Sequence, residues 1–154
     1  MIGGSIAGAL WEGSDTRIGK TFWQSVDASL IGGASYLVLN NTLRRERPSQ
    51  TDSPNRWLRR GGHSFPSGEV TAISSIVAPF VLEYGHDIPW AYALELLPAY
   101  DAEARMKTQG HWQTDVLAGW ALGTAAGYLA RFLAQPLTVS VLPRGLTIGW
   151  HRQF

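Results

Sequence analysis

A strongly basic, polar segment divides this chain into apolar stretches that are each long enough for helices. The segment runs from Arg44 to Gly62 and holds six arginines and two prolines among small polar residues. Such a composition is typical of a solvated loop. On both sides of it, apolar residues recur at the spacing of amphipathic helices. We therefore expect an all-α fold that forms a single domain over residues 1–154.

Capping residues and chain breakers predict four helices. These are a helix that follows Ser14-Asp15-Thr16 and reaches Leu43, the run Val70–Tyr84 opened by Pro66-Ser67-Gly68, a helix from Pro89 to Glu103, and Trp112–Leu133. Either Ser64 or Ser67 is suited to cap the second of these helices. Gly119, Gly123 and Gly127 lie four apart on one face of the last helix. This spacing indicates close packing against a neighbouring helix rather than a catalytic role.

The two ends of the chain have different patterns. Residues 137–154 alternate apolar and polar side chains around Leu142-Pro143-Arg144-Gly145, which predicts a short β-hairpin-like tail. Ile2–Leu10 is apolar but has no basic residues before it, so it reads as the remnant of a longer precursor or as the end of a first helix.

The composition excludes several classes of function. The net charge of +1 gives no reason to expect nucleic acid binding, and the lack of cysteine excludes disulfides, thiolate metal sites and cysteine nucleophiles. Four scattered histidines show no metal-ligand spacing, so we expect no metal and no cofactor.

The charged fraction of 16% is below the roughly 25% of soluble domains. Val116–Ala130 is almost free of charge yet shorter than the ~20 residues of a membrane span, so both a membrane-embedded and a soluble protein remain open.

One pair of side chains could supply a nucleophile. His111 and Asp115 are four residues apart, so on a helix they share a face. A carboxylate that accepts a hydrogen bond from one imidazole nitrogen fixes the tautomer and leaves the other nitrogen free to attack. An isolated His–Asp pair is more often structural, but here other polar clusters accompany it.

Two clusters are suited to hold an anion. Ser67, Gly68 and Glu69 place backbone N–H groups at a predicted helix N-terminus, which attracts negative charge. Arg47 and Arg105 carry guanidinium groups that can grip phosphate oxygens in fork geometry. Each feature is weak alone, and their order along the chain is the stronger signal.

Taken together, the clusters resemble the three-part signature of the PAP2 superfamily of phosphatidic acid phosphatases, bacterial acid phosphatases and vanadium haloperoxidases. The family pattern is Lys-x6-Arg-Pro, Pro-Ser-Gly-His and Ser-Arg-x5-His-x3-Asp, and the resemblance covers Asn40 to Asp115. It implies a helical bundle whose helix ends meet at one phosphate pocket, and a metal-independent hydrolase with a phosphohistidine intermediate. The implied substrate is a phosphate monoester of a small molecule or lipid, or a lipid diphosphate, and the implied location is a bacterial cell envelope, at the inner membrane or in the periplasm. The oligomeric state is left open.

The chain departs from this pattern at three positions: Asn40 replaces lysine, Ala104 replaces serine and Glu69 replaces the second histidine. The resemblance implies that Glu69 is the general acid, working at lower pH than a histidine. It also implies that Asn40 weakens phosphate binding unless Arg44 or Arg45 reaches the site. His63 is a possible substitute acid, whereas His86 and His151 have no evident role.

Three alternatives remain. One is a PAP2-like membrane protein with a degenerate site that binds phosphate or other anions without turnover. A second is a vanadium haloperoxidase, which the missing lysine and histidine disfavour. A third is a membrane scaffold, which leaves the order of the motifs unexplained.

Overall fold

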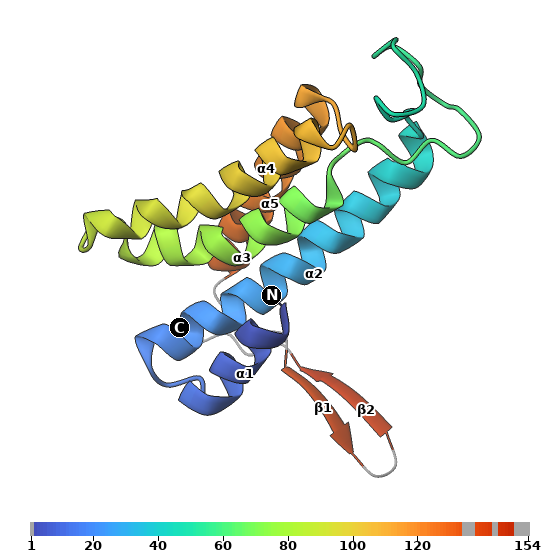
Figure 1. Ribbon diagram of the computed structural model, residues 1–154. Helices are drawn as coiled ribbons and strands as arrows, with labels where there is room; N and C mark the ends of the chain where they lie inside the picture. Colours follow the sequence, from blue (N-terminus) through green and yellow to red (C-terminus); the bar gives the residue numbers. More distant parts are fainter. Residues whose placement is uncertain (1, 134–137, 143–144, 150–154) are drawn as a thin grey trace.

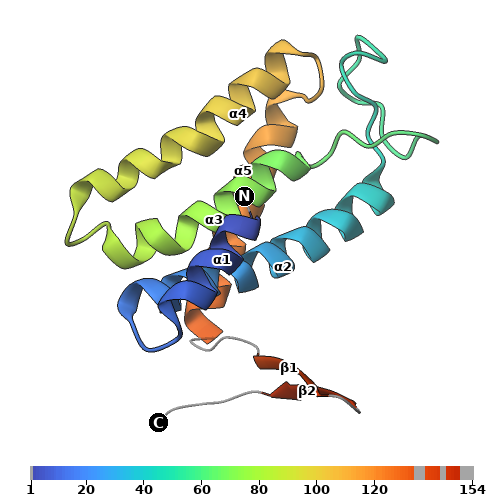
Figure 2. The same ribbon diagram turned by 60° about the horizontal axis from the view of Figure 1, so that its bottom comes forward.

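The computed structural model describes residues 2–133, 138–142 and 145–149, and the fold is all-α as predicted (Figure 1). Its helical elements, in chain order, are α1 (Ile2–Glu12), α2 (Arg17–Leu43), α3 (Gly68–Tyr84), the 3-10 helix η1 (Pro89–Glu95), α4 (Leu96–Lys107) and α5 (Gln113–Leu133). The apolar stretch Ile2–Leu10 lies within α1. Helices α2, α3 and α5 pack together, and α1 folds back on α2 (Figure 2).

The predicted helix starts are confirmed by their caps. The Thr16 hydroxyl accepts a hydrogen bond from the Gly19 N–H at 3.0 Å, and the Ser67 hydroxyl accepts from the Val70 N–H at 3.4 Å. Helix α2 ends at Arg44, whose left-handed backbone (φ 40°) stops the helix and begins the basic loop.

The prediction of one continuous helix from Pro89 to Glu103 was wrong. The segment forms η1 and then α4, which continues to Lys107. Pro98 explains the break, because it has no N–H to donate to the Leu94 carbonyl and therefore fits only in the first turn of a new α-helix.

The glycine face of α5 packs closely on α3, as predicted. A Cβ atom on Gly119 would lie 2.5 Å from the Ser67 carbonyl oxygen, and one on Gly123 would collide with the Thr71 carbonyl oxygen. A Cβ on Gly127 would lie 2.6 Å from the Ala78 Cβ. This contact places the first turn of α5 directly beside the N-terminus of α3.

Ionic contacts join the helices at the opposite end of the bundle. The Arg17 Nε lies 2.6 Å from Glu83 Oε1, and the Arg131 Nη1 lies 2.7 Å from Glu83 Oε2. Arg17 Nη2 also lies 2.7 Å from Asp87 Oδ2. The start of α2 is thereby linked to the end of α3, and the end of α3 to the end of α5.

Strand β1 (Thr138–Leu142) pairs antiparallel with β2 (Gly145–Gly149), with Thr138 opposite Gly149. Pro143 and Arg144 of the predicted turn, and His151, lie outside the described residues.

Candidate active site

The three motif clusters meet at the end of the bundle where the loop after α2 lies beside the link between α4 and α5 (Figures 1 and 2). The Ser49 N–H donates to the Gln109 carbonyl at 3.1 Å, and the Ser67 N–H donates to the Asp115 carbonyl at 2.9 Å. The Trp112 indole N–H donates to the Glu46 carbonyl at 2.9 Å. These bonds hold segments together that are far apart in the sequence.

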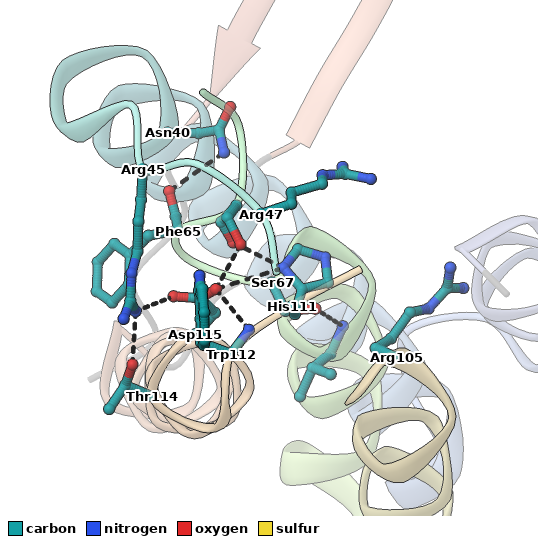
Figure 3. Close-up of polar contacts among 12 residues, drawn as sticks. Asn40, Arg45, Arg47, Phe65, Ser67, Arg105, His111, Trp112, Thr114 and Asp115 are labelled. Atoms are coloured by element: carbon teal, nitrogen blue, oxygen red, sulfur yellow. Dashed lines mark hydrogen bonds and ion pairs between the residues drawn. The ribbon is translucent and has the colours of Figure 1, made fainter. Parts of the chain in front are cut away.

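His111 is buried, with 4% of its surface exposed. Its Nδ1 lies 2.7 Å from the Ser64 carbonyl oxygen (Figure 3). Since a carbonyl can only accept, Nδ1 must carry the proton, and Nε2 is free in the neutral ring. The free nitrogen faces Glu69, whose Oε2 lies 3.5 Å away.

The carboxylate of Asp115 does not take the bonded position expected for it. Its Oδ2 lies 3.9 Å from His111 Nδ1, beyond hydrogen-bond distance, because the Ser64 carbonyl accepts that proton instead. The two Asp115 oxygens have other donors. Arg45 Nη1 lies 2.6 Å from Oδ1, while the Ser64 hydroxyl and the Trp112 N–H lie 2.5 and 2.8 Å from Oδ2.

Arg45 is a buried residue of this site whose role the sequence did not reveal. Its guanidinium also donates to the Thr114 hydroxyl at 2.6 Å and to the Pro54 carbonyl at 2.9 Å, and it lies over the Trp57 ring at 4.6 Å. Arg45 therefore neutralises Asp115 and does not replace the missing lysine. A buried aspartate requires a cation nearby. The loop holds six arginines, so the sequence does not show which of them pairs with Asp115.

The N-terminus of α3 is less open to an anion than the sequence suggested. The Ser67 N–H is used by the Asp115 carbonyl, and its hydroxyl caps the helix, so Ser67 is committed to structure. Gly68 packs against Tyr36, and a Cβ at this position would lie 2.8 Å from the ring, so a larger residue would require the ring to shift.

Glu69 lies among the groups that would hold a phosphate. Its Oε1 lies 3.4 Å from Arg105 Nη1, and its Oε2 faces His111 Nε2. The pKa of Glu69 is lowered from 4.5 to about 2, first by the interaction with His111 and then by its own backbone N–H and the charge of Arg105, while burial acts in the opposite direction. The carboxylate is therefore ionised at neutral pH in the ligand-free protein.

Two arginines extend toward the same side of the His111 ring, Arg47 from the loop after α2 and Arg105 from α4 (Figure 3). Arg105 also bonds Asp101 of its own helix at 3.3 Å. The Arg47 N–H donates to the Gln50 side chain at 2.9 Å, which orders the loop. In the described part of the chain, no carboxylate pairs with the Arg47 guanidinium.

Asn40 serves the loop rather than the open side of the site. It is buried, its Nδ2 donates to the Phe65 carbonyl at 3.2 Å, and its Oδ1 accepts from His63 Nδ1 at 2.9 Å. An amide occupied in this way anchors the segment that presents Ser64 to His111.

Two features of the described residues bear on ligands and membranes. No group of three or more histidine, aspartate or glutamate side chains is arranged to hold a metal ion. One helix, Gln113–Leu133, has the length and apolar composition of a membrane span, although the core helices of soluble proteins can share both properties.

Comparison with known proteins gives two matches. The family model of the PAP2 superfamily matches residues 23–137. The lipid A 1-phosphatase of Porphyromonas gingivalis is 32% identical over 131 residues, which cover 84% of this chain and 27% of that protein. The chain thus spans about a quarter of the length of this relative. No solved structure matches the chain significantly.

Proposed function

Because the chain belongs to the PAP2 superfamily, we propose that it is a phosphatase in which His111 attacks the phosphorus of a phosphate monoester. The observation that carries this proposal is the buried His111 ring, whose Nδ1 proton is held by the Ser64 carbonyl so that Nε2 faces the arginines. This is the arrangement that a nitrogen nucleophile needs.

The proposed reaction has two steps. In the first, the Nε2 lone pair forms a bond to phosphorus as the bond to the leaving oxygen breaks, and that oxygen takes a proton from Glu69. In the second, water attacks phosphorus, Glu69 accepts a proton from it, and the N–P bond breaks. Arg47 and Arg105 stabilise the charge on the three equatorial oxygens.

The protonation state of the His111–Glu69 pair decides whether this reaction can begin. With Nδ1 bonded to Ser64, Nε2 can donate to Glu69 only if the ring is an imidazolium. A pair of imidazolium and carboxylate would have neither a free lone pair nor an acid, whereas a neutral ring beside a protonated Glu69 has both. A bound phosphate anion raises the pKa of the Glu69 carboxyl group and so favours the protonated acid that the reaction needs.

We also propose that the substrate is a phosphorylated lipid in a bacterial envelope membrane. A lipid A phosphatase is among the relatives, and large apolar side chains are exposed on η1 and α4, notably Trp90 (84%) and Tyr100 (76%). Helix α4 also carries Arg105, so these apolar residues and the proposed phosphate site share one element. A lipid lying on α4 could therefore present its headgroup to the site.

Phosphate release from a panel of lipid and soluble monophosphates, between pH 4 and 8 with and without detergent, tests the proposal. His111→Ala should lower turnover on the order of a thousandfold or more while the protein remains folded. His86→Ala is the matched control, because His86 is fully exposed and its Nδ1 lies 3.4 Å from the neighbouring Asp87, outside the site. Near-normal turnover by folded His111→Ala would rule out the mechanism.

A second candidate function is anion binding without turnover. The observation that favours it is the ionised Glu69, which competes with phosphate for Arg105, together with the commitment of Asn40 to the loop. Phosphate binding by a wild-type protein that releases no phosphate from any ester would support this alternative. Bromide oxidation in the presence of vanadate would instead indicate a haloperoxidase.

A further inference from the structure

A chain of buried hydrogen bonds joins Asp115 to His111 without a direct bond between them. Ser64 has no exposed surface, and it uses all three of its polar groups in this chain. Its N–H donates to the Arg45 carbonyl at 2.9 Å, its hydroxyl donates to Asp115 Oδ2 at 2.5 Å, and its carbonyl accepts from His111 Nδ1 at 2.7 Å.

We propose that Ser64 is the positioning residue for the nucleophile, and that Asp115 acts on His111 through Ser64. This inference rests on the proposed function and names a further residue of the same site. The separation of 3.9 Å between Asp115 Oδ2 and His111 Nδ1 leaves the Ser64 carbonyl as the acceptor that fixes the tautomer. The direction of that carbonyl depends in turn on what holds the Ser64 side chain and backbone.

The hydroxyl bond is the strongest of these constraints. It ends on an ionised carboxylate, and such charge-assisted bonds are shorter and stronger than neutral ones. Arg45 fixes the acceptor by holding the other Asp115 oxygen at 2.6 Å, and the Arg45 carbonyl fixes the Ser64 N–H. Ser64 is thus held on both sides, so its carbonyl has one orientation toward the ring.

This arrangement differs chemically from a direct His–Asp pair. A neutral carbonyl holds the Nδ1 proton but stabilises a positive ring less than an adjacent carboxylate does. The carbonyl thus favours the neutral Nδ1–H ring, in which the Nε2 lone pair is free to attack. In this arrangement Ser64 orients the His111 ring, while Arg45 compensates the negative charge of Asp115.

Ser64→Ala tests the proposal, because it removes the hydroxyl and keeps the carbonyl. We expect kcat for phosphate release to fall between about tenfold and a hundredfold, through misplacement of the ring, with KM changed by less than about twofold. In ¹⁵N-histidine NMR spectra, the His111 signals should change from a uniform Nδ1–H form to a mixture of tautomers. The His111 signals are assigned by their loss in His111→Ala. Ser75→Ala is the matched control, since Ser75 is a fully buried serine of α3 outside the site, and it should change neither readout.

A double variant separates action through Ser64 from direct action of Asp115. If Asp115 acts through Ser64, Ser64→Ala/Asp115→Asn should be no slower than Asp115→Asn alone. The proposal would be overturned if the losses in kcat of the two single variants multiplied in the double variant, or if the His111 tautomer were unchanged in Ser64→Ala. Failure of the proposed function is recognised separately, as a wild-type protein that releases no phosphate; the NMR readout still tests Ser64 in that case.

Discussion

Glu69 replaces the second histidine of the family pattern, and its carboxylate lies against the groups that we propose hold the substrate phosphate. It lies 3.4 Å from Arg105 and 3.5 Å from His111 in the ligand-free protein. We predict that Glu69→Gln binds inorganic phosphate or vanadate more tightly, by roughly tenfold, because a negative charge is removed from the site. Isothermal titration calorimetry measures this, with Glu103→Gln as a control that removes an exposed carboxylate of α4. Equal affinities for Glu69→Gln and wild type would show that Glu69 does not occupy the phosphate position.

The same variant tests whether Glu69 is the general acid. Glu69→Gln has no proton to donate, so hydrolysis of alkyl phosphates should slow by about a hundredfold or more, whereas nitrophenyl phosphate, whose leaving group needs no proton, should be affected much less. Undiminished rates on alkyl phosphates would assign the acid elsewhere. His63 is then the next residue to test, although its Nδ1 is bonded to Asn40.

The lowered pKa of Glu69 predicts two opposite responses to pH. A carboxyl group whose pKa falls from 4.5 to about 2 on folding stabilises the protein above pH 4.5, and this contribution is lost as the pH falls toward 2. The proposed reaction instead requires the protonated acid, so the rate should rise as the pH falls from neutrality into the acidic range. Glu69→His should move the optimum toward neutral pH. A wild-type optimum above pH 7 would contradict this assignment.

Arg45 is predicted to matter for stability rather than for phosphate binding. Arg45→Met removes the cation and leaves Asp115 as an uncompensated buried charge, which should lower the free energy of unfolding by about 3–5 kcal/mol. Arg59→Met is the control and should stay within about 0.5 kcal/mol of wild type, because its side chain is exposed in the same loop. Urea denaturation followed by circular dichroism compares the two, and similar small losses would show that the Arg45 pair is not required.

At the scale of helices, the contact between α3 and α5 aligns the site. The Gly119 contact with the Ser67 carbonyl and the bond from the Ser67 N–H to Asp115 connect the same two helix starts. A change in the spacing of these helices would therefore move His111 relative to Glu69. The glycines of α5 affect the chemistry in this indirect way.

Gly123→Ala should destabilise the protein by about 1–3 kcal/mol, because its Cβ would collide with Thr71 and lie 2.6 Å from the Ser74 Cβ. Gly33→Ala is the matched control, since its Cβ has no atom within 4 Å in the middle of α2. It should stabilise the helix by about 0.4–1 kcal/mol. Thermal and chemical unfolding measure both, and a stabilised Gly123→Ala protein would show that the helices can separate without loss.

At the scale of the whole molecule, the exposed apolar side chains of η1 and α4 predict a preference for lipid interfaces. Trp90→Ser combined with Leu96→Ser should slow phosphate release from a lipid monophosphate in mixed micelles, by about tenfold or more, because less apolar surface would be buried in the lipid. Hydrolysis of a soluble monophosphate by the same variant is the internal control and should be unchanged. Equal loss on both substrates would indicate damage to the fold instead.

Much of this protein could be predicted from local sequence patterns. The starts of α2 and α3 follow from the capping residues Thr16 and Ser67, and the extent of α5 follows from its apolar run. Both signals are local, because caps and helical periodicity act over a few residues. The order of the motifs predicted the PAP2 superfamily, which the family model and the relative confirm. The break before α4 was not predicted. Pro98 is compatible with the first turn of a helix but interrupts a helix that has already begun, and the sequence did not show where the α-helix begins.

The sequence by itself determined which chemical groups are present and where most of the helices lie. Only the tertiary structure decided how those groups pair. His111 bonds a carbonyl 47 residues away, and Asp115 bonds an arginine 70 residues away, so no spacing along the chain could show either contact. Each buried polar group must find a partner among whatever packing brings near it. The loop between α2 and α3 lies against the start of α5, so Ser64 and Arg45 take the bonds that the sequence had suggested for His111 and Asp115 alone.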